Sequence, residues 1–510
     1  MPTRFLDLAV ISAYLAGITW FGARFRRKQR TLQDYFLGGK TVPWWAIALS
    51  IVSAETSTLT VIGTPVLAFQ GNYGFLQVVL GYLAARIVIS ALFLPAYFRG
   101  EMYTAYELMR RRFGDRIRRL TAGTFLVLRA LAEGVRVVAI SLVVSIVIGV
   151  GDKSSIAVIL CLTLFYTYEG GMTAVIWTDV VQMFIYVAGA AVSFFVILRE
   201  IPGGWPHVLA VAAPLGKLQV FDFHLGAGFF SRTYTFWAGL IGGCFLTTAS
   251  HGTDQLMVQR LLAARDQRSS RAALMSSWVV IFIQFTLFLM IGTCLFTLYS
   301  DRHWTPPDVP DRLYPLFIWQ HLPVGIAGLV IAAILAAAMS NLSAALNSLA
   351  FATVMDFWKP LSGALSGPDP SGRGGTTNDD ARWLRLSRRV TVVWAGVLFG
   401  VSMFAREWGS VLEAGLSIAS VLYGSLLGVF LLGLLTRRVG EKAAMFGMCA
   451  GFALILYVKL ETSIAWTWYV LVGTAGTFLA GLAASLIFKP DPSGWGYQEQ
   501  PKENPSGKAT

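Results

Sequence analysis

The chain has 510 residues, of which 55% are hydrophobic and only 14% charged, and its mean hydropathy is +0.61. This composition excludes an ordinary soluble protein, and the long continuous apolar runs lack the alternation of an outer-membrane barrel. Because lipid admits only helices and closed barrels as spanning structures, the sequence predicts an all-α polytopic membrane protein.

The sequence predicts about thirteen membrane-spanning helices, since each needs roughly 20 apolar residues to cross a bilayer core. They lie near residues 5–24, 44–70, 74–98, 122–149, 154–171, 173–198, 234–259, 273–300, 323–357, 390–405, 409–436, 443–460 and 465–488. A basic cluster follows the first span, whereas a signal peptide has its basic residues before the apolar run. We therefore expect an extra transmembrane helix over 1–30 and no cleaved signal peptide.

The basic residues divide unevenly between the two sets of loops that these spans create. Of the 41 lysines and arginines, 29 fall in alternate loops that must share one face, nine fall on the other face, and Arg86, Arg129 and Arg136 lie within spans. Cytoplasmic loops carry the excess of Lys and Arg. We therefore expect a cell (inner) membrane protein with its N-terminus outside and its C-terminus in the cytoplasm. Topology explains the net charge of +13, so no nucleic-acid partner is expected.

Four polar segments lie between or after the spans. The external loop 199–233 is long enough to carry a short helix, and the basic stretch 103–120 is typical of an interfacial helix on anionic headgroups. Residues 362–381 are rich in Gly, Ser, Pro and Asp, which predicts a flexible cytoplasmic linker. The polar segment 489–510 is expected to be a disordered cytoplasmic tail.

Ionisable side chains inside the spans are costly in lipid and are commonly functional. Arg129, Glu133 and Arg136 are spaced four and three residues apart, so they lie on one helix face. They form either an ion-pair cluster that fixes helix packing or a site where an arginine binds a carboxylate. The full set of ionisable side chains in the spans is Glu55, Arg86, Arg129, Glu133, Arg136, Asp179, Asp254 and Glu413.

Polar residues interrupt three of the spans. Residues 49–58 of the second span and 247–255 of the seventh lie five helices apart, and transporter folds place the solute at such broken helices near the midplane. On the ninth span, Ser340, Ser343 and Asn347 recur at helical spacing and share a face. Hydroxyls and freed carbonyls from two facing helices suit a hard cation, although a polar seam that packs helices together has the same pattern.

The interrupted spans carry a resemblance to a known family. The motifs, in chain order, are Asp34-Tyr35-Phe36-Leu37-Gly38-Gly39, Ser53-Ala54-Glu55-Thr56, Val175-Ile176-Trp177-Thr178-Asp179-Val180-Val181-Gln182, Asp254-Gln255 with Gln259-Arg260, Met339-Ser340 through Asn347-Ser348, and Met355-Asp356. Together they resemble the sodium:solute symporter family, which includes sugar, proline and sialic-acid carriers. The resemblance implies a LeuT-type fold with two inverted five-helix repeats, over 44–198 and 234–436, followed by two helices over 437–488.

The resemblance also implies a sodium site between the second and ninth spans. Backbone carbonyls of Leu49, Val52 and Ala337 and the hydroxyl of Ser340 would hold the ion. The family usually has a second Ser or Thr at the next position, where this chain has Asn341, whose amide oxygen can also ligate a cation. Sodium is therefore the expected coupling ion.

Two further sites are expected. Asp179 matches the acidic residue of the sixth span that the family links to a second cation site or coupling path, and Ser343 could join it. The resemblance assigns four residues to the solute cavity, and Arg136 is added because a guanidinium suits a carboxylate. The expected solute-binding residues are thus Thr56, Thr247, Ser250, His251 and Arg136.

The sequence thus predicts a secondary active transporter that moves a small polar organic solute together with sodium by alternating access. Two alternatives stay open, namely a proton-coupled carrier that uses Asp179 or His251, and a transporter-like membrane sensor. An enzyme is not expected, because the sequence shows no nucleophile–base pair or metal cluster. The expected partners are a small-molecule solute and the lipid bilayer.

Overall fold

The structure is a computed structural model that describes residues 4–23, 40–99, 105–166, 172–358, 377–405 and 411–488. Within these ranges every regular element is a helix, which confirms the all-α prediction. The motif at 34–39, the linker residues 362–376 and the tail 489–510 lie outside the described residues. Residues 377–381, predicted to end the flexible linker, are helical instead.

The helices follow one another without interruption by strands in the described ranges. In chain order they are α1 (Phe5–Ala23), α3 (Trp44–Glu55), α4 (Thr58–Gln70), α5 (Phe75–Val88), η3 (Ile89–Phe93), α6 (Leu94–Tyr97), α7 (Ala105–Phe113), α8 (Asp115–Ile148), α9 (Asp152–Tyr166), α10 (Met172–Glu200), α11 (Gly204–Ala212), η4 (Ala238–Gly242), α12 (Gly243–Gly252), α13 (Gln255–Leu262), α14 (Gln267–Asp301), η5 (Pro310–Arg312), α15 (Leu313–His321), α16 (Ile326–Ala352), η6 (Thr353–Trp358), α18 (Thr377–Ala405), α19 (Val411–Leu435), α20 (Glu441–Glu461), η7 (Trp466–Trp468) and α21 (Tyr469–Ile487).

A helix lies within each of the predicted spans, but not all of these helices are long. Among the described residues, eight helices are long and apolar enough to cross a membrane, and the bent pair α3 and α4 makes a ninth. The helix α1 and the apolar part of α18 are shorter. The count of thirteen spans therefore stays a prediction. Helix α7 lies within the stretch 103–120 that was predicted to be interfacial, and α11 lies within the loop 199–233 that was predicted to be external.

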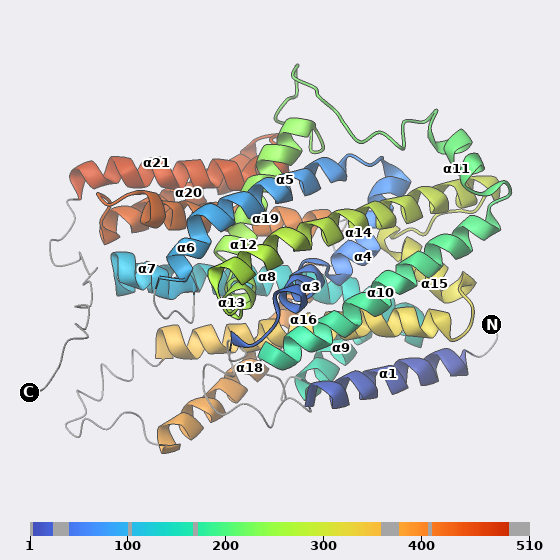
Figure 1. Cartoon of the computed structure of the whole chain (residues 1–510), viewed down its shortest axis with the longest axis horizontal. Coiled ribbons are helices and arrows are strands. Elements are labelled where there is room, and N and C mark those ends of the chain that lie inside the picture. Colours follow the sequence, from blue (N-terminus) through green and yellow to red (C-terminus); the bar gives the residue numbers. More distant parts are fainter. Residues whose placement is uncertain are drawn as a thin grey trace, which may run out of the picture.

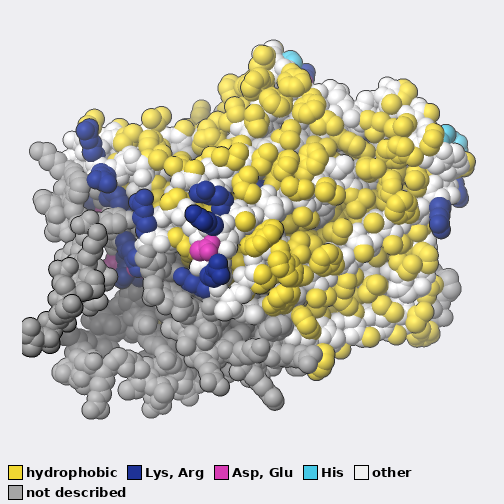
Figure 2. Space-filling view, viewed as in Figure 1, with side chains coloured by type: hydrophobic (Ala, Val, Ile, Leu, Met, Phe, Trp, Pro, Cys, Tyr) yellow, Lys and Arg dark blue, Asp and Glu magenta, His cyan; other side chains and the backbone are white. Residues whose placement is uncertain are grey.

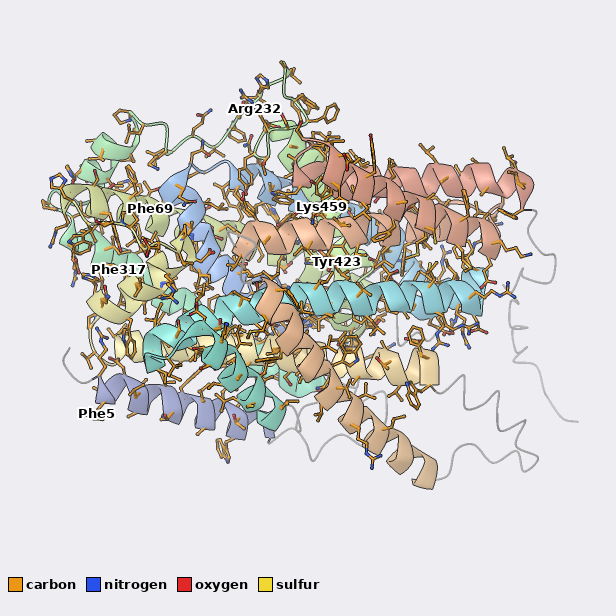
Figure 3. The ribbon with its side chains drawn as sticks, turned by 180° about the vertical axis from the view of Figure 1, so that it is seen from behind. Phe5, Phe69, Arg232, Phe317, Tyr423 and Lys459 are labelled. Atoms are coloured by element: carbon orange, nitrogen blue, oxygen red, sulfur yellow. The ribbon has the colours of Figure 1, made fainter. Side chains whose placement is uncertain are left out.

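The long helices run roughly along the horizontal axis in Figure 1. At one edge α20 and α21 pack on α19, and at the other α1 packs on α16. Between these edges α14 packs on both α3 and α4, and α12 packs on α5. Seen from behind, α18 crosses α8 obliquely, and α8 runs beside α19, the helix that carries Tyr423 (Figure 3). The broken spans thus lie in the middle of the bundle.

The outer surface is suited to lipid. Hydrophobic side chains cover most of the face seen in Figure 2, whereas lysines and arginines gather toward the end where α7 lies. Large apolar side chains such as Phe184, Phe195 and Leu486 are exposed. A continuous apolar surface of this kind associates in water, but hydrocarbon tails solvate it. The chain is therefore a multi-pass membrane protein.

Among the described residues, two spans are broken near their middles, as the sequence predicted. The helices α3 and α4 meet at an angle of 63°, and the chain leaves helical geometry at Thr56 and Ser57. The second break separates α12 from α13, where the Asp254 carboxylate accepts a hydrogen bond from the Leu256 amide (2.9 Å) and caps α13. Each break frees backbone groups that need partners, so both are positioned to serve a binding site.

Candidate functional site

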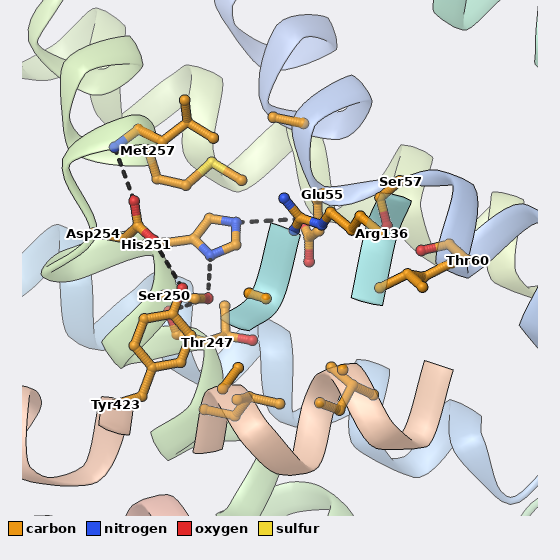
Figure 4. A pocket seen from close by; sticks show the side chains of 18 of the residues that line it. Glu55, Ser57, Thr60, Arg136, Thr247, Ser250, His251, Asp254, Met257 and Tyr423 are labelled. Atoms are coloured by element: carbon orange, nitrogen blue, oxygen red, sulfur yellow. Dashed lines mark hydrogen bonds and ion pairs between the residues drawn. The ribbon is translucent and has the colours of Figure 1, made fainter. Parts of the chain in front are cut away.

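A cavity of about 130 Å³ lies between the two helix breaks. Its walls come from the break between α3 and α4, from α5 and α8, from the break between α12 and α13, and from α14 and α19. Most of the lining is apolar, with a few polar groups converging on it (Figure 4). Binding sites for small molecules have this composition, so the cavity is the candidate solute site.

One wall of the cavity is an ion-pair cluster centred on α8. The Glu133 carboxylate lies 2.5 Å from Arg136 Nη1 and 3.2 Å from Arg129 Nε. At the break between α12 and α13, Asp254 Oδ2 lies 3.5 Å from Arg129 Nη1 and accepts a hydrogen bond from the Tyr423 hydroxyl (2.8 Å). The ion pairs expected along one face of this helix are present. Glu133 and Arg129 are 0% and 4% exposed, whereas Arg136 is 21% exposed, so Arg136 is the member most open to the cavity.

The arginines of this wall hold unused donors. Within the described part of the chain, Arg136 Nε and Arg129 Nη2 are buried and have no hydrogen-bond partner. A guanidinium carries five N–H donors in a planar fork, and buried donors that stay unpaired are costly. An acceptor with two oxygens in the cavity would satisfy them.

A second ion-pair cluster at the cavity joins Glu55 to two basic side chains. Glu55 Oε2 lies 2.6 Å from Arg86 Nη2, and Arg86 is held in turn by the Leu274 carbonyl and the Ser277 hydroxyl of α14. His251 Nε2 lies 3.3 Å from the same Glu55 oxygen. The remaining ring nitrogen, Nδ1, contacts the Ser250 hydroxyl at 2.8 Å. The two helix breaks are therefore linked to each other by polar side chains across the cavity, as Figure 4 shows.

The charges around the cavity balance. The carboxylates and guanidiniums that pair around the cavity are equal in number, so their formal charges cancel. A buried charge is tolerated when it is paired and hydrogen-bonded, and each of these groups has an opposite charge within 3.5 Å. The charged groups are Glu55, Glu133 and Asp254 against Arg86, Arg129 and Arg136.

Four of the five residues expected at the solute site line this cavity, namely Thr247, Ser250, His251 and Arg136. Thr56 does not line it. Its side chain is buried on the other side of the helix break, where the hydroxyl donates to Gln284 Oε1 (3.0 Å). The break therefore turns Thr56 away from the cavity and leaves its neighbours Glu55 and Ser57 facing it.

The residues expected to bind sodium lie on two helices that share a neighbour. Leu49 and Val52 belong to α3, and Ala337 and Asn341 belong to α16. The helix α10 packs against both α3 and α16. The Ser340 side chain lies outside the described part of the structure. Sodium binding by this set stays a prediction.

Asp179 is held by an arginine. Its Oδ2 accepts hydrogen bonds from the Ser50 hydroxyl (2.6 Å) and from Arg260 Nη2 (3.0 Å), and Arg260 Nε also donates to Ser50 Oγ (3.0 Å). Asp179 and Arg260 are both 1% exposed. The cluster joins α10, α3 and α13, and the guanidinium compensates the carboxylate charge. Among the described residues no hydrogen bond joins Asp179 to Ser343, and their shared cation site stays a prediction.

Sequence reasoning missed Tyr423 and Gln284. Tyr423 lies in a long apolar span and differs little from a packing aromatic until its contact with Asp254 is seen. Gln284 stands alone in the apolar run Phe282-Ile283-Gln284-Phe285. A single uncharged polar residue in a span costs free energy, and this signal could have identified it.

Comparisons with known proteins address the function. Residues 35–451 match the sodium:solute symporter family. The sodium/sialic acid symporter SiaT of Proteus mirabilis is 26% identical over 504 residues, which cover 95% of this chain and 96% of the relative. The human sodium-coupled monocarboxylate transporter 1 is 30% identical over 442 residues, which cover 86% of this chain and 70% of the relative.

The fold also matches a solved structure. A Na⁺-coupled sialic acid symporter in a substrate-bound, outward-open state superposes with a TM-score of 0.80 at 25% identity. The match covers 95% of this chain and 98% of the other. The resemblance therefore extends over nearly the whole length of both proteins.

Proposed function

The chain belongs to the sodium:solute symporter family and is a sodium-coupled secondary transporter, and we propose that its solute is a small organic carboxylate bound by Arg136. The observation that carries this proposal is a guanidinium that faces the cavity with a buried, unpaired Nε donor. The relatives are named as transporters of sialic acid and of monocarboxylates, so a carboxylate solute fits their chemistry.

The geometry of an arginine favours a carboxylate over a neutral solute. The planar fork of N–H donors matches two carboxylate oxygens, and such charge-assisted bonds are roughly twice as strong as neutral ones. Glu133 fixes the position of Arg136 through Nη1 and leaves its other donors available. Thr247, Ser250 and His251, which also line the cavity, would contact the rest of the solute.

The charge balance of the cavity supports coupling to sodium. A carboxylate that entered alone would add an uncompensated charge to a neutral buried cluster, which is strongly unfavourable. Entry together with one sodium ion keeps the region neutral. We place that ion at Leu49, Val52, Ala337, Ser340 and Asn341, between the inner half of the first broken span and α16. The relatives are named as sodium-coupled, which favours sodium over proton coupling through Asp179 or His251. They are also named as transporters, which favours transport over a sensor function.

Alternating access follows if sodium and solute bind one conformation better than the other. Ligands shift a conformational equilibrium only by their differential affinity for its states, and the coupling must be reciprocal. The solute should therefore raise the affinity for sodium by the same factor by which sodium raises the affinity for the solute. We also propose that the chain lies in the cell membrane with its N-terminus outside, so that an inward sodium gradient drives uptake.

Uptake by proteoliposomes tests the proposed solute. Purified protein is given labelled carboxylates, sugars and amino acids, with an inward gradient of sodium or, separately, of potassium. We expect sodium-driven accumulation of a carboxylate alone. The substitution Arg136→Lys keeps the positive charge but removes the planar fork of N–H donors. It should weaken the apparent solute affinity by roughly tenfold or more.

A matched control is Arg312→Lys, because Arg312 pairs with Asp152 in the external region at 2.6 Å and lies outside the cavity. This variant should transport as the unsubstituted protein does. Sodium-driven accumulation of a neutral sugar that survives Arg136→Met would overturn the carboxylate proposal. Equal accumulation with sodium and potassium gradients would overturn the coupling mechanism.

A further inference from the structure

The short helix α13, which follows the second break, contacts both the solute cavity and the helices of the proposed sodium site. At its start, Leu256 and Met257 line the cavity. Its body packs against α3 and against α16, the two helices that carry the proposed sodium ligands. Seven of its eight residues are buried. An element packed this closely cannot move without displacing its neighbours, so the position of α13 affects both sites.

The two oxygens of Asp254 have different partners at the start of α13. Oδ1 accepts the hydrogen bond from the Leu256 amide that caps the helix. Oδ2 lies 3.5 Å from Arg129 Nη1. Arg129 pairs with Glu133, and Glu133 pairs with Arg136, the proposed solute ligand. One carboxylate therefore ties the first turn of α13 to the charged groups of the solute cavity.

The other end of α13 is tied to α3 by Arg260. Arg260 Nη1 donates to a carbonyl one turn back in its own helix (2.9 Å), which holds the guanidinium against α13. Its Nη2 and Nε donate to Asp179 Oδ2 and to Ser50 Oγ, both at 3.0 Å. Ser50 lies between Leu49 and Val52 in α3, whose carbonyls are proposed to bind sodium. A displacement of α13 would therefore move the segment of α3 that offers these carbonyls.

The break lets α13 move separately from α12. The chain leaves helical geometry at Thr253 (φ −126°, ψ −18°) and is extended at Asp254 (φ −80°, ψ 125°). Hinges in proteins are a few residues at the ends of elements that absorb backbone rotation. The helix can thus tilt as a unit about the break, with one charged contact at the cavity and the other at α3.

We propose that Asp254 is a positioning residue that couples the solute cavity to the sodium site through α13. Sodium bound between α3 and α16 fixes the position of α13, and Asp254 then fixes Arg129 and, through Glu133, Arg136. Two sites are coupled when both bias the same element, and the coupling acts equally in both directions. The inference rests on the sodium site proposed above and does not depend on which solute the cavity binds.

Cysteine labelling in intact cells tests the coupling with sodium alone as the probe, and no solute is added. The four native cysteines are replaced by alanine, and Ala419→Cys places one thiol at the lining of the cavity. Sodium that enters from outside must bind a conformation whose cavity opens outward. It should therefore raise the rate of reaction with a membrane-impermeant maleimide, relative to potassium. Binding of radiolabelled sodium to the purified protein is measured in parallel.

The variant Asp254→Asn separates the helix cap from the link to the cavity. Its amide oxygen can still accept from the Leu256 amide, whereas an N–H donor takes the place of the oxygen that faces Arg129. We expect this variant to bind sodium, but the effect of sodium on labelling should fall by roughly fivefold or more. The matched control is Asp266→Asn, because Asp266 caps α14 through the Ser269 amide (2.7 Å). It should respond to sodium as the unsubstituted protein does.

The variant Ser50→Ala tests the other end of α13 without changing a charge. The pair of Asp179 and Arg260 remains, but α3 loses the hydroxyl that bonds to it. We expect the same loss of the sodium effect. The double variant of Ser50→Ala with Asp254→Asn should lose no more than either single variant, since both changes interrupt one path.

The outcomes separate this inference from the proposed function. A sodium effect on labelling that persists in Asp254→Asn would overturn the inference, and so would losses that add in the double variant. In both cases the radiolabelled ion still binds, so the proposed sodium site is unaffected. If the unsubstituted protein binds no sodium, the proposed sodium site fails and the inference fails with it. Because no solute is present, failure of the carboxylate proposal changes none of these outcomes.

Discussion

At the scale of the residue, the buried charge of Asp179 is compensated by a partner on another helix. Asp179 and Arg260 are both almost fully buried, and Ser50 bonds to each of them. A buried pair of this kind contributes little net stability relative to apolar residues of the same size, whereas removing one partner leaves an uncompensated charge. The pair therefore constrains which helices meet more than it stabilises the fold.

We predict that Arg260→Met destabilises the protein by roughly 3–5 kcal/mol and that adding Asp179→Leu restores much of the loss, because the double change removes both charges. Thermal unfolding in detergent, analysed as a double-mutant cycle, measures the effect. The control pair is Asp222 with Arg232, which is exposed at 3.4 Å and should contribute at most about 1 kcal/mol. If the double variant is as unstable as Arg260→Met alone, the charge of Asp179 is not the cause.

The residues that the sequence predicted best are those whose partners are close in the chain. Arg129, Glu133 and Arg136 are spaced to share a helix face, and the structure pairs them. The partners of Asp179 and Asp254 lie on other spans, at Arg260 and Tyr423. Spacing along one helix says nothing about which helices become neighbours, so sequence reasoning named these carboxylates without their partners.

At the scale of the element, three helices of the described part of the chain begin at a carboxylate supplied by a distant segment. Asp7 accepts from the amides of Gly325 and Gly328 at the start of α16. Glu441 accepts from two amides in the first turn of α8. Asp311 accepts from the Val411 amide at the start of α19 (3.0 Å). Negative groups stabilise helix N-termini, and each of these contacts also ties two parts of the fold together.

These remote caps explain why span boundaries were harder to predict than span positions. The apolar run predicted a span from residue 122, but α8 begins at Asp115. Hydropathy marks the part of a helix that lies in lipid, whereas the end of the helix depends on where its first amides find acceptors. For α8 that acceptor is Glu441, which is far away in the sequence.

The Asp311 cap should make stability depend on pH. Burial raises the pKa of Asp311 to about 6, the Val411 amide opposes the shift, and the charge of Glu413 adds to it. Because the folded protein then binds this proton more tightly than the unfolded chain, stability is highest at low pH and falls as pH rises toward about 6. We predict that Asp311→Asn removes this slope and gains up to about 3 kcal/mol relative to the unsubstituted protein above that range.

Thermal unfolding at about pH 4.5 and about pH 7.5 checks this prediction, since the linkage appears as a difference between the two conditions. Asn can still accept from the Val411 amide, so the cap is kept while the charge is removed. Asp308→Asn, in the exposed part of the same loop, should leave the pH dependence unchanged. A slope that persists in Asp311→Asn would assign it to another group.

At the scale of the whole molecule, the fold follows from one requirement. In lipid every backbone N–H and C=O group must find a hydrogen-bond partner within the protein. Apolar runs predicted where helices lie, and a helix lies within each of the predicted spans. The two breaks were predicted because Ser, Thr and Gly interrupt apolar spans at corresponding places, and α3–α4 and α12–α13 are broken there. The direction of individual side chains at a break, such as Thr56, could not be predicted, since it depends on how the chain leaves helical geometry.

The orientation of the bundle in the membrane is the last prediction, and it rests on where charges lie at its two ends. The basic helix α7 lies at the end of the bundle where α21 ends, and α1 begins at the other end, where α11 and α15 also lie. Cytoplasmic segments carry the excess of Lys and Arg, so the α7 end should face the cytoplasm. The sodium gradient of a cell would then drive the solute inward.

Labelling of single cysteines with a membrane-impermeant maleimide tests this orientation, after Cys161, Cys244, Cys294 and Cys449 are replaced by alanine. Ser231 is exposed in the loop that is predicted to be external, and Arg265 is 83% exposed between α13 and α14. We expect Ser231→Cys to react in intact cells, and Arg265→Cys to react only after the membrane is permeabilised. Labelling in the reverse order would invert the topology, and the same sodium gradient would then drive export.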